Sequence, residues 1–70
     1  MAKYDAVEIG KRLVALRGIR TRVGVAKETG IPVTTLQGYE KGKRVPSPGN
    51  MIILAKYYGV SVQHLFFDQR

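Results

Sequence analysis

The chain has no cysteine and only one histidine among its 70 residues. Without cysteine it can form neither a disulfide framework nor a cysteine-based metal site, and such a composition suits a reducing compartment. We interpret the single histidine, His64, as a surface residue because no cluster of carboxylates accompanies it. We find no nucleophile with a matching base, no metal-ligand spacing and no glycine-rich phosphate loop. The sequence therefore predicts no enzyme activity and no cofactor.

Long apolar runs and acidic residues are also scarce. No run approaches the roughly 18 apolar residues of a membrane span, and the start, Met-Ala-Lys-Tyr-Asp, lacks the apolar segment of a signal peptide. We expect a cytoplasmic protein with no membrane partner. Only 5 Asp+Glu stand against 12 Lys+Arg, which gives a formal net charge of +7. This excess indicates a nucleic-acid partner, with plain solubility or attraction to anionic lipid as the alternatives.

The length and the helical periodicity predict one small all-α domain. Seventy residues bury only about 60 % of the surface of the unfolded chain, so the stability is expected to be modest. Cap residues and glycine stops predict five helices in a compact domain over 1–70, with its core at about 6–67. The expected helices cover 6–17, 22–29, 33–40, 48–58 and 62–67. We expect Arg12 to face solvent or phosphate, and Ile19, in a short connection, to be held against the core.

Two of these helices form the most informative segment, 21–42. Gly30 is a helix stop, and Pro32 follows so closely that a second helix must begin at a steep angle to the first. The segment resembles the Cro/repressor-type (XRE) helix-turn-helix family, and the likeness extends over roughly residues 8 to 67. The matching residues in the segment are Thr21, Arg22, Val25, Ala26, Gly30, Ile31, Pro32, Thr35, Leu36, Gln37, Tyr39, Glu40 and Gly42. The resemblance implies a lambda-repressor-like fold and binding to double-stranded DNA.

The resemblance also implies which residues face the bases. The outward positions of the second helix are Val33, Thr34, Gln37 and Gly38. Gln37 suits adenine, Thr34 a base edge or a phosphate, and the methyl groups of Val33 the methyl group of thymine. Gly38 costs roughly 0.5–1 kcal/mol inside a helix. Either the backbone approaches the DNA closely there, or drift has removed an arginine that is common at this position. The alternative for all four is an ordinary solvent-exposed face.

Other positions are expected to contact phosphate or to hold the fold together. The predicted phosphate-contacting residues are Thr21, Arg22, Lys41, Lys43 and Arg44. Arg22 replaces the family's usual glutamine, whose amide can also brace the second helix, and this leaves the bracing role open. By resemblance, Glu40 pairs with Arg17 at the end of the first helix. Pro32 replaces a serine cap, worth on the order of 1 kcal/mol, while presetting the backbone for the helix start.

Apolar residues outside the predicted core suggest self-association. They are Ile52, Ile53, Tyr57 and Phe67, and we expect a homodimer interface built around Ile53, Tyr57 and Phe67. A dimer would bind a pseudo-palindromic operator, and scattered surface hydrophobes are the alternative.

We interpret the chain as a transcriptional regulator, in particular a repressor. The rivals are an antitoxin-type protein-interaction module, for which no extra tail is evident, a fragment of a longer regulator, and an RNA-binding or membrane-surface role.

Overall fold

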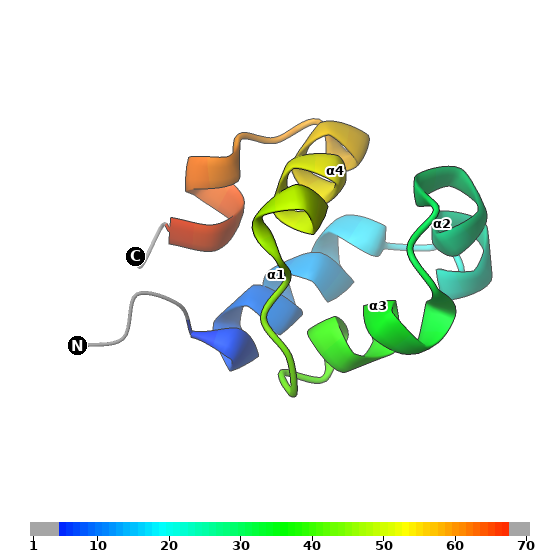
Figure 1. Cartoon of the computed structure of the whole chain (residues 1–70), viewed down its shortest axis with the longest axis horizontal. Helices are drawn as coiled ribbons and strands as arrows, with labels where there is room; N and C mark the ends of the chain where they lie inside the picture. Colours follow the sequence, from blue (N-terminus) through cyan, green and yellow to red (C-terminus); the bar gives the residue numbers. More distant parts are fainter. Residues whose placement is uncertain (1–4, 68–70) are drawn as a thin grey trace.

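The computed structural model describes residues 5–67, and every regular element in this range is a helix. The elements are α1 (Ala6–Arg17), α2 (Arg22–Thr29), α3 (Val33–Glu40), α4 (Pro48–Tyr58) and the short π-helix η1 (Gln63–Phe67). Figure 1 shows α1 crossing the middle of the molecule, with α3 below it and α4 above it. The predicted all-α fold of five helices is confirmed, while the predicted domain limits, 1–70, extend beyond the described residues.

Side-chain caps begin the helices where the sequence predicts them. Asp5, Thr21 and Ser47 accept hydrogen bonds from backbone amides in the first turns of α1, α2 and α4. Ser61 acts in the same way before η1, because its hydroxyl oxygen accepts the amide proton of His64 at 2.9 Å. Such caps satisfy amides that have no partner inside the helix. The last helix lies where we expected it, but most of it is wound as a π-helix.

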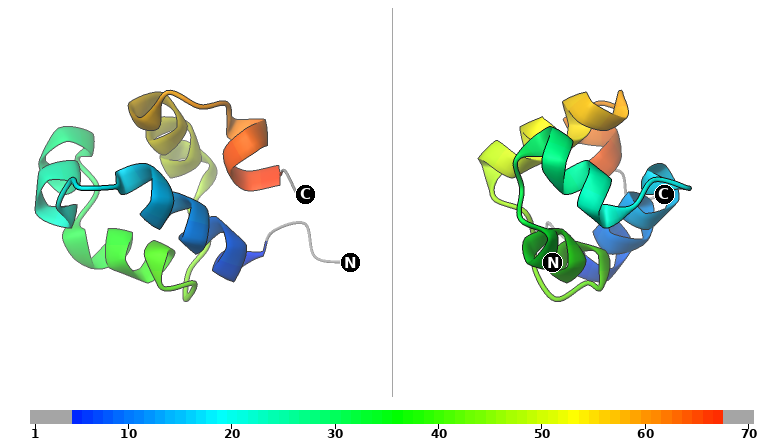
Figure 2. Two further views of the ribbon diagram at one scale, coloured as in Figure 1. Left: turned by 180° about the vertical axis from the view of Figure 1, so that it is seen from behind. Right: turned by 90° about the vertical axis from the view of Figure 1, so that its right-hand side faces the viewer.

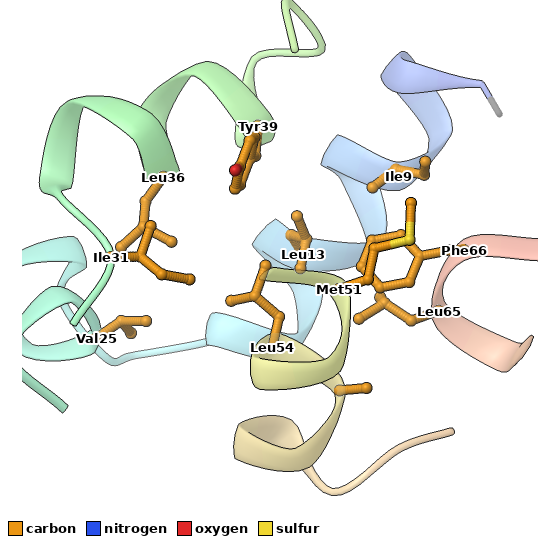
Figure 3. Close-up of a cluster of buried hydrophobic side chains, with 11 residues drawn as sticks. Ile9, Leu13, Val25, Ile31, Leu36, Tyr39, Met51, Leu54, Leu65 and Phe66 are labelled. Carbon is orange, nitrogen blue, oxygen red and sulfur yellow. The ribbon is translucent and has the colours of Figure 1, made fainter. Parts of the chain in front are cut away.

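One apolar core joins all five helices. Figure 3 shows its side chains converging from each helix and from the turn between α2 and α3. The buried residues are Ile9, Leu13, Val25, Ile31, Leu36, Tyr39, Met51, Leu54, Ala55, Leu65 and Phe66. Burial of a large aliphatic or aromatic side chain contributes about 1.5–3 kcal/mol, so this cluster is the main source of stability. It also fixes how α2 and α3 present their opposite faces.

Two glycines lie where the backbone of α1 approaches the carboxyl end of α3. A Cβ atom on Gly10 would lie 2.6 Å from the carbonyl oxygen of Glu40 and 2.7 Å from that of Tyr39. A Cβ atom on Gly42, just after α3, would lie 3.0 Å from the Cα atom of Val7. Neither distance leaves room for a side chain. The carboxyl end of α3 therefore rests directly on the backbone of α1.

Two expectations about side chains near α1 are wrong. Ile19, expected to be held against the core, is fully exposed. The turn around it is closed by polar contacts instead, because the Arg20 amide donates to the Arg17 carbonyl at 3.0 Å and Arg17 Nη1 donates to the Arg20 carbonyl at 2.7 Å. Arg12, expected to face solvent or phosphate, donates from Nη1 to the carbonyl oxygen of Leu65 at 3.1 Å. This hydrogen bond joins α1 to η1.

Candidate nucleic-acid interface

The turn between α2 and α3 is held by contacts on both of its sides. Gly30 adopts the left-handed conformation, with φ of 80°, and its amide donates to the Ala26 carbonyl at 2.9 Å. The hydroxyl of Thr29 donates to the Val25 carbonyl at 2.7 Å and accepts the Ile31 amide proton at 3.2 Å. Ile31 is buried and anchors the turn in the core. The left view of Figure 2 shows α2 at one end of the molecule, with α3 starting beneath it.

Helix α3 has a buried face and an outward face. Leu36 and Tyr39 point into the core, where the Tyr39 hydroxyl accepts a hydrogen bond from Asn50 Nδ2 of α4 at 2.8 Å. The remaining positions include one exposed residue, Thr34, and three partly exposed ones, Val33, Gln37 and Gly38. These are the four residues that the sequence analysis assigned to the bases. Side chains of this size on an otherwise anchored helix suit insertion into the major groove of DNA, which admits one α-helix.

Pro32 begins α3 without a side-chain cap. It adopts φ of −58° and ψ of 146°, and its carbonyl oxygen accepts the Leu36 amide proton at 3.0 Å. The helix therefore starts at Val33, as expected, although no side chain bonds its first amides. Proline supplies the backbone conformation that the missing serine would otherwise help to select.

Glu40, the last residue of α3, lies between two arginines. Its Oε2 atom is 2.8 Å from Arg17 Nε of α1, and its Oε1 atom is 2.8 Å from Arg22 Nε of α2. The Glu40 side chain is 4 % exposed, against 18 % for Arg17 and 35 % for Arg22. The hydrogen bond to Glu40 raises the pKa of Arg17 above its ordinary value. The pair with Arg17 is the expected one, and the contact with Arg22 gives that residue the bracing role that the sequence left open.

The predicted phosphate-contacting residues occupy two places beside the outward face of α3. Thr21 and Arg22 are at the start of α2, where the Thr21 hydroxyl accepts the Gly24 amide proton at 3.0 Å. Lys41, Lys43 and Arg44 follow the carboxyl end of α3, and all three are exposed. Arg22 is partly exposed, but its Nε atom already binds Glu40. Because Arg22 binds Glu40, the last residue of α3, both places lie toward the carboxyl end of α3, and positive charge gathers there.

The apolar residues predicted to lie outside the core divide into two kinds. Ile52 and Ile53 of α4 are exposed, whereas Tyr57 and Phe67 pack partly against the core. The Tyr57 hydroxyl donates to the carboxylate of Glu28, which joins α4 to α2 and raises the pKa of Tyr57 above its usual value. The Arg20 guanidinium also lies 5.7 Å from the centroid of the Tyr57 ring. The prediction that Tyr57 and Phe67 lie outside the core is therefore wrong, because both pack partly against it.

Two positions that set the geometry of this surface are not predicted from the sequence. Only the contact of Gly10 with the backbone of α3 shows why this residue has no side chain. The role of Asn50 likewise becomes clear only from its hydrogen bond to Tyr39. The one signal available for Gly10 was a glycine in the middle of an otherwise good helix, where it costs about 1 kcal/mol relative to alanine.

Residues 5–67 show neither a cluster of metal ligands nor a helix that could span a membrane. No group of three or more potential ligands among histidine, cysteine, aspartate and glutamate could hold a metal ion within these residues. In the same part of the chain, none of the helices combines the length and the apolar character needed to cross a bilayer.

Comparisons with known proteins agree with this geometry. A family model described as helix-turn-helix matches residues 11–65. The restriction-modification controller protein C.AhdI from Aeromonas hydrophila is 30% identical, with 89% of this chain and 97% of that chain covered and a TM-score of 0.79. The DNA-binding domain of BldD from S. venezulae is 29% identical, with 89% and 96% covered and a TM-score of 0.74. The SOS-response transcriptional repressor LexA from Eubacterium rectale, 23% identical with 100% of this chain and 78% of that chain covered, shares the fold with a TM-score of 0.85. No curated protein matches the sequence significantly.

Proposed function

Because the chain belongs to the helix-turn-helix family, we propose that it is a transcriptional regulator that recognises a specific operator in double-stranded DNA. The observation that carries the proposal is the outward face of α3, which has positively charged residues beside its carboxyl end. Helix α3 would enter the major groove, and occupation of the operator would repress transcription. The protein would act in the cytoplasm, without enzyme activity or a cofactor.

The outward face of α3 would supply the sequence readout. Gln37 can form two hydrogen bonds with the N6 and N7 atoms of adenine. Thr34, which is exposed, can bond a base edge or a phosphate, and Val33 can pack against the methyl group of thymine. These residues lie on one face of a helix whose other face is buried, so their positions relative to one another are fixed. A helix held in this way can discriminate between bases rather than merely touch the groove.

Phosphate contacts would set the register of the domain on the duplex. Thr21 and Arg22 at the start of α2 and Lys41 and Lys43 after α3 are the groups we assign to this role. Contacts of this kind supply affinity for any sequence and weaken as salt displaces them. Arg22 would reach a phosphate only with the part of its guanidinium that Glu40 leaves open.

Selection of binding sites from random duplexes, followed by salt titration, tests the proposed function. We expect one enriched sequence that the protein binds roughly 10³-fold or more tightly than random DNA. Binding to random DNA should fall steeply with salt, while the selected site keeps its advantage because base contacts do not depend on released counterions. Equal binding to all duplexes at every salt concentration would contradict specific regulation and leave only charge attraction.

We also propose that the protein binds its operator as a homodimer through the exposed face of α4 around Ile53. Ile52 and Ile53 are adjacent and exposed, and Tyr57 and Phe67 are only partly covered by the core. A two-fold pair would place its two copies of α3 in successive major grooves, about 34–36 Å apart. The selected operator should then be a pseudo-palindrome.

Sedimentation of two matched variants tests the dimer. Ile53 is 39% exposed on α4 and Val14 is 43% exposed on α1, so a glutamate at either position should be tolerated by the fold. We expect Ile53→Glu to shift the protein from dimer to monomer at high micromolar concentration, because it places a charge in the interface, and Val14→Glu to leave the dimer intact. A wild-type protein that sediments as a monomer under these conditions without DNA would contradict the dimer.

A further inference from the structure

The Arg44 side chain lies directly beside the place where a side chain of residue 38 would begin. A Cβ atom built on Gly38 would lie 3.2 Å from Cδ of Arg44, 3.5 Å from its Cγ and 3.8 Å from its Nε. The Arg44 side chain therefore lies across Gly38, on the outward face of α3. The sequence alone suggests two explanations of Gly38, a close approach of DNA to the backbone or the loss of an arginine. The contact with Arg44 is a third explanation, which arises within the protein itself.

The end of α3 is built so that Arg44 reaches this place. Gly42 adopts the left-handed conformation with φ of 76°, which turns the chain back on the helix. The amide of Lys43 then donates to the carbonyl oxygen of Gly38 at 3.0 Å, an arrangement typical of glycine-terminated helices. Arg44 is the next residue, so its side chain starts beside the backbone of Gly38. The position of Arg44 over Gly38 thus depends on the backbone hydrogen bonds at the end of α3 as well as on the rotamer of the Arg44 side chain.

Arg44 also differs from the other arginines in residues 5–67. The guanidinium groups of Arg12, Arg17, Arg20 and Arg22 each donate to a carbonyl or carboxylate oxygen of the protein. Within the described residues, the guanidinium of Arg44 has no hydrogen bond or ion pair, and the residue is exposed. Its stem is thus packed on the outward face of α3 while its donors stay available. An arginine placed in this way suits the N7 and O6 acceptors of guanine in the major groove.

We propose that Arg44, packed across Gly38, is a base-reading residue of this domain that recognises guanine at one position of each half-site. The inference rests on the proposed function, because it requires α3 to lie in the major groove. Sequence position alone groups Arg44 with Lys43 as a phosphate contact. The packing of Arg44 over the helix distinguishes it from Lys43. In this position its planar guanidinium would face the base edges at the floor of the groove. The loop after α3 would then contribute to sequence specificity together with the outward face of α3.

The test compares Arg44→Ala with Lys43→Ala on the operator selected by the wild-type protein. Arg44→Ala should lose roughly 5- to 150-fold in discrimination at a single guanine-containing base pair of each half-site. Lys43→Ala should weaken binding to all sequences alike and reduce the slope of log affinity against log salt by about 1. If Arg44→Ala also weakens all duplexes equally and reduces the slope, Arg44 is a phosphate contact and the inference is overturned. Failure of the wild-type protein to select any site would instead overturn the proposed function.

A second variant tests the role of Gly38. Gly38→Leu fills the space of the Arg44 stem but keeps the helix, since leucine favours helix formation over glycine. We expect it to melt no lower than wild type and to lose discrimination at the same base pair as Arg44→Ala. Added to Arg44→Ala, it should cost no further discrimination there. If Gly38→Leu causes the same loss of discrimination in the Arg44→Ala background as in the wild type, residue 38 faces the DNA directly. That result would contradict the role of Arg44.

Discussion

Replacement of Glu40 by glutamine is expected to lower the free energy of unfolding by about 3 kcal/mol. The carboxylate is almost fully buried and accepts from Arg17 and Arg22 at 2.8 Å on each of its two oxygens. Removal of its charge leaves two guanidinium groups close together without their common partner. Both arginines reach solvent in part, so the cost belongs at the lower end of the range for broken buried pairs. For a domain of this size, the melting temperature should fall by roughly 12–24 °C.

The matched control is Glu8→Gln, and both variants are to be followed by thermal unfolding monitored by circular dichroism. Glu8 lies 3.7 Å from Lys11, and the two side chains are 48% and 71% exposed. An exposed pair contributes only about 0–1 kcal/mol, so this variant should melt close to wild type. Arg17→Ala should also destabilise the fold strongly, yet bind DNA when folded at low temperature. If Glu40→Gln and Glu8→Gln melt alike, the buried ion pairs do not hold α3 in the way described.

Replacement of Gly10 by alanine is expected to destabilise the domain by about 1–3 kcal/mol, although alanine is the better helix former. The added methyl group would lie 2.6 and 2.7 Å from two carbonyl oxygens at the end of α3. These are backbone atoms, which cannot swing aside as the end of a side chain can. Helices α1 and α3 must therefore move apart, and the core between them loses contacts. Urea unfolding measures the effect as a lower midpoint.

Gly49 supplies the control for this prediction. It lies in the first turn of α4, and a Cβ atom there would meet nothing within 4 Å. Gly49→Ala should therefore stabilise the protein by about 0.4–1 kcal/mol, because alanine reduces the freedom of the unfolded chain. Opposite signs for Gly10 and Gly49 are the expected result. A Gly10→Ala variant as stable as wild type would show that α1 and α3 are not in backbone contact.

The helix limits were predictable because each depends on residues next to it in the sequence. Asp5, Thr21 and Ser47 cap helices through amides two or three positions away. Periodic apolar residues likewise predicted the helices themselves. Gly30 marked the turn of the helix-turn-helix for the same local reason, since it supplies a left-handed backbone conformation. Features of this kind need no knowledge of the rest of the fold.

The misplaced residues depend on parts of the chain that are distant in sequence. Ile19 was expected in the core on account of its apolar side chain, but the core is complete without it and leaves it exposed. Arg12 bonds a carbonyl 53 positions away, and Tyr57 bonds Glu28 29 positions away. The role of Arg22 in holding Glu40 likewise required the positions of three helices. Pattern and propensity do not fix such pairings.

The carboxyl end of α3 carries the ion pairs and the close backbone contact that attach this helix to its neighbours. Glu40 and Gly42 hold that end against α1 and α2, while within residues 5–67 the side chains of Thr34 and Gln37 make no hydrogen bond or ion pair. Under the proposed function, target preference and folding depend on separate sets of residues. Substitutions on the outward face would then change the operator that is bound, without a matching loss of thermal stability.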